Sequence, residues 1–134
     1  MSKIYLDACI VIYFVENHPV YATKIEGLIN DLDVNDTLCC SPLVRMECLV
    51  MPLRTKDGTL RNQYESFFGA QEMLEISVGR FDEAAQLRAD FNSLKTPDAL
   101  HLATALHHDC DGFWTNDSRL DSVAPSLVKN ILIK

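Results

Sequence analysis

The stretch IYLDACIVIYF, residues 4–14, decides the fold of this chain. It opens with three apolar residues that Asp7 closes, and a second apolar run follows from Ile10. A short apolar run bounded by a polar residue is typical of a buried strand, and the longer run after it is typical of a helix. The segment therefore predicts a buried strand that runs directly into a helix.

The remainder of the chain repeats this alternation. Strands are predicted at residues 4–6, 37–40, 73–76, 113–115 and 130–133. Helices are predicted at residues 10–15, from Pro19 through Leu32, from Pro42 to about Val50, over 60–71, over 81–91, from Pro97 to about His108, and over 118–123. Strands that alternate with helices imply a parallel sheet covered on both faces, an α/β fold. No linker or repeat interrupts the pattern, so residues 1–134 are expected to form a single domain.

The composition is that of an ordinary globular protein, with 48% hydrophobic and 23% charged residues. No run approaches the about 20 apolar residues of a membrane span. Asp7 falls where the apolar region of a secretory signal would continue. The five cysteines are odd in number and lack CxxC spacing, as in proteins of a reducing compartment. These features predict a cytoplasmic protein that does not enter a membrane.

Acidic residues outnumber basic ones, 19 Asp and Glu against 12 Lys and Arg, which gives a net charge of −7. This balance argues against nucleic-acid binding by general phosphate neutralisation. It does not exclude an enzyme that acts on nucleic acid, because a bound cation compensates carboxylates in a metal site. A modest basic region contains Arg45, Arg54, Lys56 and Arg61. Ordinary solvated surface charge is the alternative interpretation of that region.

Two aspartates directly follow predicted strands. Asp7 closes the first strand, and Asp117 comes just after the fourth. Ligands of parallel sheets bind at the carboxyl ends of the strands, and two carboxylates at that edge repel unless a cation or proton lies between them. The alternative for each residue alone is that it caps the following helix.

Two further acids lie on predicted helices. Glu47 shares a helical face with Leu43, Val50 and Met51, so we expect that face to point at the core and its carboxylate to need a partner. A salt bridge to Arg88 is the alternative to a functional role. Asp98 falls in the first turn of a helix and shares a face with apolar residues. Stabilisation of the helix by an acidic first turn is the alternative for Asp98.

One shared site accounts for four carboxylates at strand ends and on inward helical faces better than four unrelated roles do. Hard oxygen ligands at this density suit Mg²⁺ or Mn²⁺. The chemistry that follows is metal-assisted hydrolysis of a phosphate ester. Without a cation the carboxylates should repel, so at least one should have a raised pKa. The histidines follow no metal-binding spacing, so a zinc site would have to be assembled by the fold and is not expected.

Four segments together resemble the PIN domain: IYLDACIVIYF at 4–14, SPLVRMECL at 41–49, KTPDALHLATAL at 95–106 and FWTNDSRL at 113–120. The resemblance is closest to the VapC-type ribonuclease toxins of toxin–antitoxin pairs and extends over essentially the whole chain. Carried over residue by residue, it places the acidic quartet and two supporting polar residues on Asp7, Glu47, Asp98, Asp117, Thr115 and Asn116.

The resemblance implies a three-layer α/β/α sandwich with strand order 3-2-1-4-5, and Mg²⁺- or Mn²⁺-dependent endonucleolytic cleavage of RNA. It also implies a homodimer, inhibited by a cognate antitoxin whose C-terminal segment enters the active-site groove. In that setting the basic residues Arg45, Arg54, Lys56 and Arg61 are expected to contact RNA. The alternative is a PIN-like module that binds RNA or protein without turnover. A missing acid would favour that alternative, but all four are present.

One departure from the family concerns the support of the first aspartate. The family often has a hydroxyl or amide residue after it, whereas Ala8 and Cys9 follow Asp7 here. Support for the site is therefore expected to differ. Asp121 lies one helical turn after Asp117 and could approach a cation through water. We favour its interpretation as a solvated surface carboxylate.

Overall fold

A computed structural model of the chain describes residues 1–131, and it centres on one parallel sheet. The strands are β1 (Lys3–Leu6), β2 (Thr37–Cys40), β3 (Glu72–Met73), β4 (Gly112–Thr115) and β5 (Val128–Asn130). Their order in the sheet is β3-β2-β1-β4-β5, and every neighbouring pair is parallel. The predicted five-stranded sheet and its order are therefore confirmed.

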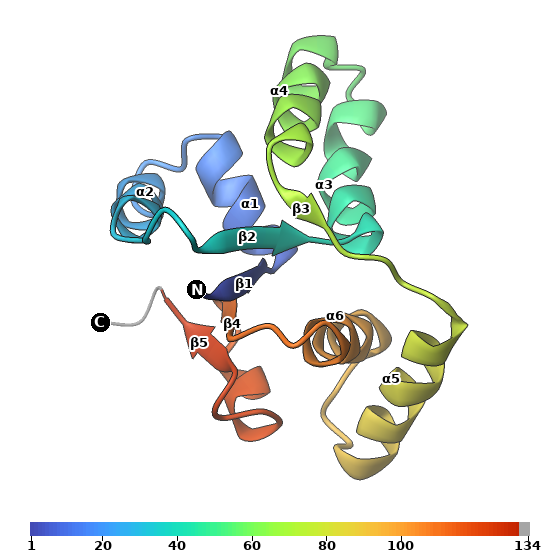
Figure 1. Cartoon of the computed structure of the whole chain (residues 1–134). Coiled ribbons are helices and arrows are strands. Elements are labelled where there is room, and N and C mark those ends of the chain that lie inside the picture. Colours follow the sequence, from blue (N-terminus) through green and yellow to red (C-terminus); the bar gives the residue numbers. More distant parts are fainter. Residues whose placement is uncertain (132–134) are drawn as a thin grey trace.

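Helices cover both faces of the sheet. They are α1 (Ala8–Val15), α2 (Ala22–Asn30), α3 (Pro42–Arg54), α4 (Gly58–Gly69), α5 (Val78–Asp90), α6 (Thr96–His107) and the 3₁₀ helix η1 (Ser118–Ser122). In Figure 1, α1 to α4 lie on one side of the sheet, and α5, α6 and the segment between β4 and β5 lie on the other. This arrangement is the predicted α/β/α sandwich. Right-handed crossovers explain this division of the helices. From β1 to β3 the chain moves toward one edge of the sheet, and from β3 to β4 it crosses back, so the connecting helices fall on opposite faces.

Strand β1 occupies the middle of the sheet. Tyr5 pairs with Cys39 of β2 on one side and with Phe113 of β4 on the other, and all three residues are fully buried. The rings of Tyr5 and Phe113 stack with centroids 5.1 Å apart. The apolar run that begins the chain is thus covered on both faces, as the absence of polar alternation in it requires.

The edge strands depart from the sequence prediction. Strand β3 was predicted at residues 73–76, but only Glu72 and Met73 form it, because it has a single neighbour and its pairing with β2 ends where Leu74 turns into the core. Strand β5 begins at Val128 instead of residue 130, since pairing with Phe113 of β4 sets its register. Residues 132 and 133 of that predicted strand lie outside the described residues.

Two helix boundaries also differ from prediction. Pro19 does not begin a helix; residues 19–21 form a turn in which the His18 Nδ1 accepts the N–H groups of Val20 and Tyr21 at 3.1 Å. Helix α3 does not end near Val50 but continues through the buried Pro52. Within residues 1–131, no helix combines the length and apolar character that a membrane crossing needs.

Helix α6 is the most deeply buried helix of the sandwich. Every residue from Ala99 to Ala105 is buried, whereas Leu106 is 46% exposed. A helix that is apolar on all sides lies inside a domain, and here α5 and the sheet cover it. This packing fixes the position of any polar side chain that α6 carries.

The burial of α6 leads to a stability prediction. Replacing Leu102 with Ala should lower the free energy of unfolding by about 2 to 5 kcal/mol, because it leaves a cavity in the core. Replacing the half-exposed Leu106 with Ala is the matched control and should cost about 0.5 kcal/mol or less. Urea denaturation followed by circular dichroism measures both, and equal losses would contradict this packing.

Candidate active site

The predicted acids meet where the chain reverses direction across the sheet, between the carboxyl ends of β1 and β4. Asp7 follows β1, and its backbone N–H bonds to the carbonyl of Trp114 at 3.0 Å. This pairing places Thr115, at the end of β4, beside Asp7. The Thr115 Oγ1 donates to Asp7 Oδ2 at 2.8 Å and accepts the Asp117 N–H at 3.1 Å. Thr115 therefore links the two strand-end aspartates, as expected of a supporting residue.

Both aspartates also cap the helices that follow them. The Ala8 N–H donates to Asp7 Oδ1 at 2.8 Å, and the Arg119 N–H donates to Asp117 Oδ1 at 3.0 Å. Each aspartate thus caps the element that follows it and also contacts Thr115, which lies between them. Asp7 has no hydroxyl or amide neighbour in the sequence, and its support comes instead from the Ala8 backbone and from Thr115.

Glu47 lies in the middle of α3, but its helical face is not the core face. Val44, Cys48 and Leu49 point into the core, whereas Val50 and Met51 are 42% and 52% exposed. The expectation that Glu47 shares a buried face is wrong, because the buried side of α3 is formed by Val44, Cys48 and Leu49 and Glu47 lies at its border. Its side chain is 32% exposed.

The proposed alternative partner of Glu47 is also wrong. Arg88 donates to the carbonyl of Leu94 and to Thr96 Oγ1, at 3.1 and 2.9 Å, and so ties α5 to the start of α6. The partner of Glu47 is instead His101 of α6, whose Nε2 lies 2.5 Å from Glu47 Oε1.

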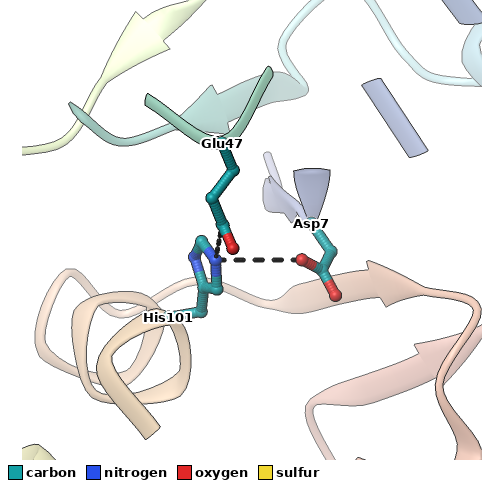
Figure 2. A group of neighbouring side chains, drawn as sticks. All are labelled: Asp7, Glu47 and His101. Atoms are coloured by element: carbon teal, nitrogen blue, oxygen red, sulfur yellow. Dashed lines mark hydrogen bonds and ion pairs between the residues drawn. The ribbon is translucent and has the colours of Figure 1, made fainter. Parts of the chain in front are cut away.

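His101 is a site residue that the sequence analysis did not select. Its buried imidazole lies between Glu47 and Asp7, with Nε2 3.9 Å from Asp7 Oδ1, as Figure 2 shows. One ligand atom from each of the three residues lies within 4.8 Å of the others. The available signal was its position three residues after Asp98, in a helix whose other buried residues are Ala, Leu and Thr.

Asp98 and Asp117 are joined by an arginine that the sequence analysis also missed. The Arg119 Nη2 lies 2.5 Å from Asp117 Oδ2 and 3.5 Å from Asp98 Oδ2. Asp98 additionally accepts the Lys95 N–H at 3.3 Å, which is the helix-stabilising role considered for it. The contacts of Thr115, His101 and Arg119 thus connect all four acids of the predicted quartet.

The two strand-end aspartates have opposite pKa shifts. Burial raises the pKa of Asp7, and the nearby His101 and the hydrogen bond from Thr115 oppose that rise. The hydrogen bonds from Arg119 lower the pKa of Asp117. The expectation of a raised pKa is confirmed for Asp7, although desolvation causes it more than repulsion between carboxylates. The folded state binds the Asp7 proton more tightly than the unfolded state does. Protonated Asp7 therefore adds to the free energy of unfolding at low pH, and this contribution is lost as pH rises through the raised pKa.

The remaining predicted residues lie at the margin of this cluster. The Asn116 amide donates to the Tyr13 hydroxyl at 2.9 Å and so fixes the loop after β4 to α1. Asp121 is not simply a solvated carboxylate. Its Oδ1 is buried and has no hydrogen-bond partner among residues 1–131, because η1 turns this oxygen inward.

The basic residues considered for RNA contact belong to α3 and α4. Arg45 pairs with Glu65 of α4 at 2.6 Å, so this cation is already compensated. Arg54 lies near the end of α3 with Nη1 3.7 Å from the Met51 sulfur. Lys56 and Arg61 line a shallow pocket at the turn between the two helices. Arg54, Lys56 and Arg61 thus lie at the end of the hairpin where α3 meets α4.

The fold and this cluster define a class of α/β domain that gathers carboxylates at the switch point of its sheet. A family model described as the PIN domain matches residues 4–125. The chain therefore belongs to the PIN-domain family. No curated protein sequence matches the chain significantly.

Solved structures with the same fold come from bacterial toxin–antitoxin systems. A chain of VapBC2 from Rickettsia felis, bound to a promoter DNA fragment, has a TM-score of 0.81 at 17% identity, with 96% of this chain and 98% of that chain covered. A chain of VapBC-1 from nontypeable Haemophilus influenzae has a TM-score of 0.80 at 15% identity, with 98% and 99% covered.

A third similar structure is VapC20 from Mycobacterium tuberculosis, described as a toxin that cleaves the sarcin–ricin loop. Its TM-score is 0.76 at 10% identity, with 90% of this chain and 95% of that chain covered. At these identities the three structures establish that the fold is shared.

The ion pair between Arg119 and Asp117 leads to a pH-dependence prediction. In Arg119→Gln the pKa of Asp117 should rise toward its ordinary value, because the charged hydrogen-bond donor is lost. The Arg119 contact stabilises the protein above the unfolded-state pKa of the carboxyl, and this contribution disappears as pH falls. Carbon-13 NMR titration of the Asp117 carboxyl measures the shift. An unchanged titration curve would show that Arg119 does not hold Asp117 in solution.

Proposed function

We propose that this protein is a divalent-metal-dependent endoribonuclease and the toxin of a toxin–antitoxin pair. The observation that carries the proposal is the convergence of Asp7, Glu47, Asp98 and Asp117, four residues from four separate parts of the fold, on one end of the sheet. Buried or half-buried acids are rarely brought together without a cation. Membership of the PIN-domain family supports the same chemistry, since PIN domains are generally nucleases.

The donor set of the cluster fits Mg²⁺ or Mn²⁺. Asp7, Glu47 and Asp98 offer carboxylate oxygens, which such hard cations prefer, and the ligand atoms of Asp7 and Glu47 are close enough to share an ion. A cation held there would polarise a phosphodiester and lower the pKa of an attacking water. The residues around it have their own tasks: Thr115 orients Asp7, and Asp117 keeps Arg119 beside Asp98.

The proposed substrate is RNA, as for the similar Mycobacterium tuberculosis toxin. The net charge of −7 makes general attraction to a polyanion weak, so RNA binding must rely on local positive charge and on the cation itself. Arg45, Arg54, Lys56 and Arg61 are the proposed phosphate contacts, because α3 carries both Glu47 and the first two of these cations.

The proposed partners are a cognate antitoxin and a second copy of the chain, in the cytoplasm. Similar structures are VapBC and FitAB complexes, which supports a protein partner. Helix α3 offers an apolar stripe for such contacts, because Met46, Val50 and Leu53 lie at helical spacing and are each more than two-fifths exposed. Apolar side chains gathered on one helix face are typical of a surface that another protein covers.

The cleavage activity is tested with purified protein, total cellular RNA, and Mg²⁺, Mn²⁺ or EDTA. Wild-type protein should create new 5′ ends only when the metal is present. Asp98→Asn should lower the cleavage rate by more than about 100-fold, because it removes a ligand charge while keeping the oxygen that accepts the Lys95 N–H.

The matched control is Asp82→Asn, which removes the same charge from an exposed position on α5 and should leave the rate unchanged. No cleavage of any RNA by the wild-type protein would favour the alternative, a PIN-like module that binds without turnover. Normal cleavage by Asp98→Asn would remove Asp98 from the site.

The RNA contacts are tested by replacing Arg45, Arg54, Lys56 and Arg61 with Ala together. RNA affinity should fall and its salt dependence should become shallower, because phosphate contacts release counterions. A double Ala variant of the exposed Lys24 and Lys129 controls for loss of general charge. Filter binding at several salt concentrations measures both. If the slope is unchanged in the quadruple variant, RNA approaches by another route.

A further inference from the structure

A buried chain of hydrogen bonds ends at Glu47. The Ser41 Oγ lies 2.7 Å from the Tyr5 hydroxyl, and that hydroxyl lies 2.6 Å from His101 Nδ1. The opposite ring nitrogen of His101, Nε2, lies 2.5 Å from Glu47 Oε1. Ser41, Tyr5 and His101 are all at most 2% exposed. Protein groups, and not water, therefore decide where the protons of this chain lie.

One direction of hydrogen-bond donation gives every group in this hydrogen-bonded chain a partner. With Glu47 as a carboxylate, Nε2 carries the proton of this contact, because two lone pairs 2.5 Å apart would repel. Nδ1 of the neutral ring then accepts the single proton of the Tyr5 hydroxyl. The Tyr5 oxygen accepts the Ser41 hydroxyl proton in turn, and Ser41 Oγ accepts the Val44 N–H at 3.4 Å. No buried donor or acceptor of the chain is left without a partner in this arrangement.

The chain of hydrogen bonds begins and ends at residues of the same helix, α3. Ser41 is the N-cap residue of α3, and Glu47 lies within α3, while Tyr5 comes from β1 and His101 from α6. Helix α3 is thus connected at two points to groups of the sheet and of the opposite helical layer. Among residues 1–131, His101 is the hydrogen-bond donor found for the Glu47 carboxylate. The direction of that carboxylate toward Asp7 depends on the imidazole.

The geometry favours a donor role for His101 over direct ligation of a cation. Ligand atoms about 2.1 Å from an octahedral Mg²⁺ lie about 3 Å apart, and the 2.5 Å separation of Nε2 and Oε1 is shorter than that. A proton between the two atoms explains so close an approach, because a hydrogen bond to a carboxylate is shorter than one between neutral groups. An imidazole that donates from Nε2 has no free lone pair on that nitrogen for a metal.

We propose that His101 is a positioning residue, held by Tyr5 and Ser41 with its proton on Nε2, that directs Glu47 into the cation site. The inference rests on the proposed function in one respect, the assignment of Glu47 as a cation ligand. Residues that orient ligands in this way typically change metal affinity by about 10- to 100-fold when replaced.

The proton position is measured in the metal-free wild-type protein. Nitrogen-15 NMR of labelled histidine, under mildly alkaline conditions, should show the His101 proton on Nε2 and the lone pair on Nδ1; the spectrum of a His101 variant assigns the signals. A proton on Nδ1 with Nε2 bare overturns the proposal. This measurement requires neither RNA nor metal, so its outcome is independent of whether the protein cleaves RNA.

The positioning role is measured by calorimetric titration with Mn²⁺. In His101→Asn the side chain reaches only the Nδ1 position, so Mn²⁺ affinity should fall about 10- to 100-fold. In His101→Gln the amide reaches the Nε2 position and can still donate to Glu47, so affinity should stay within about threefold of wild type. Unchanged affinity in His101→Asn, or equal losses in both variants, overturns the proposal.

A second pair of variants tests the chain behind the histidine. Tyr5→Phe should lower Mn²⁺ affinity by about 10-fold, because Nδ1 loses its donor, while Tyr21→Phe removes a hydroxyl outside the chain and should have no effect. Pulsed EPR of the Mn²⁺-loaded wild-type protein should show no directly bonded nitrogen; a bonded nitrogen would make His101 a ligand and overturn the proposal. If Mn²⁺ binds as expected but no RNA is cleaved, the proposed function fails and the positioning role stands.

Discussion

The buried carboxylate of Asp7 is the constraint on which the rest of the site depends. It ends the central strand, its side chain is 18% exposed, and burial raises its pKa. The groups that stabilise its charge come from three other elements: the Ala8 N–H from α1, Thr115 from β4 and His101 from α6. A slip of one residue between β1 and β4 would turn Thr115 to the other face of the sheet. The register of the sheet is therefore also a condition for the site.

The cluster consists of two differently compensated halves. Asp7 and Glu47 face a buried histidine that is fixed by a hydrogen bond on each ring nitrogen. Asp98 and Asp117 face Arg119, whose long side chain is 47% exposed. The group that compensates the acids is thus buried in one half of the cluster and about half exposed in the other.

The sequence predicted the short central strands correctly but not the contacts between distant residues. The central strands at residues 4–6 and 37–40 could be predicted, because each is a short apolar run that a polar residue ends. The face of Glu47 and its pairing with Arg88 were wrong, because tertiary packing buries the side of α3 that carries Val44 and Cys48, and because Arg88 bonds to Leu94 and Thr96 instead. His101, Tyr5 and Arg119 were missed because partners that define their roles come from other elements: Glu47 for His101, His101 for Tyr5, and Asp98 for Arg119.

The sequence by itself determined the alternation of strands and helices, the order of the sheet through its family resemblance, and the four acids. These are properties of neighbouring residues, which apolar patterning and helix capping control over a few positions. Only the tertiary structure decided which charges meet. Glu47 and His101 are 54 positions apart and lie on opposite layers of the sandwich, and they touch because the fold brings α3 and α6 together. Such proximity depends on the packing of whole layers, which no local pattern encodes.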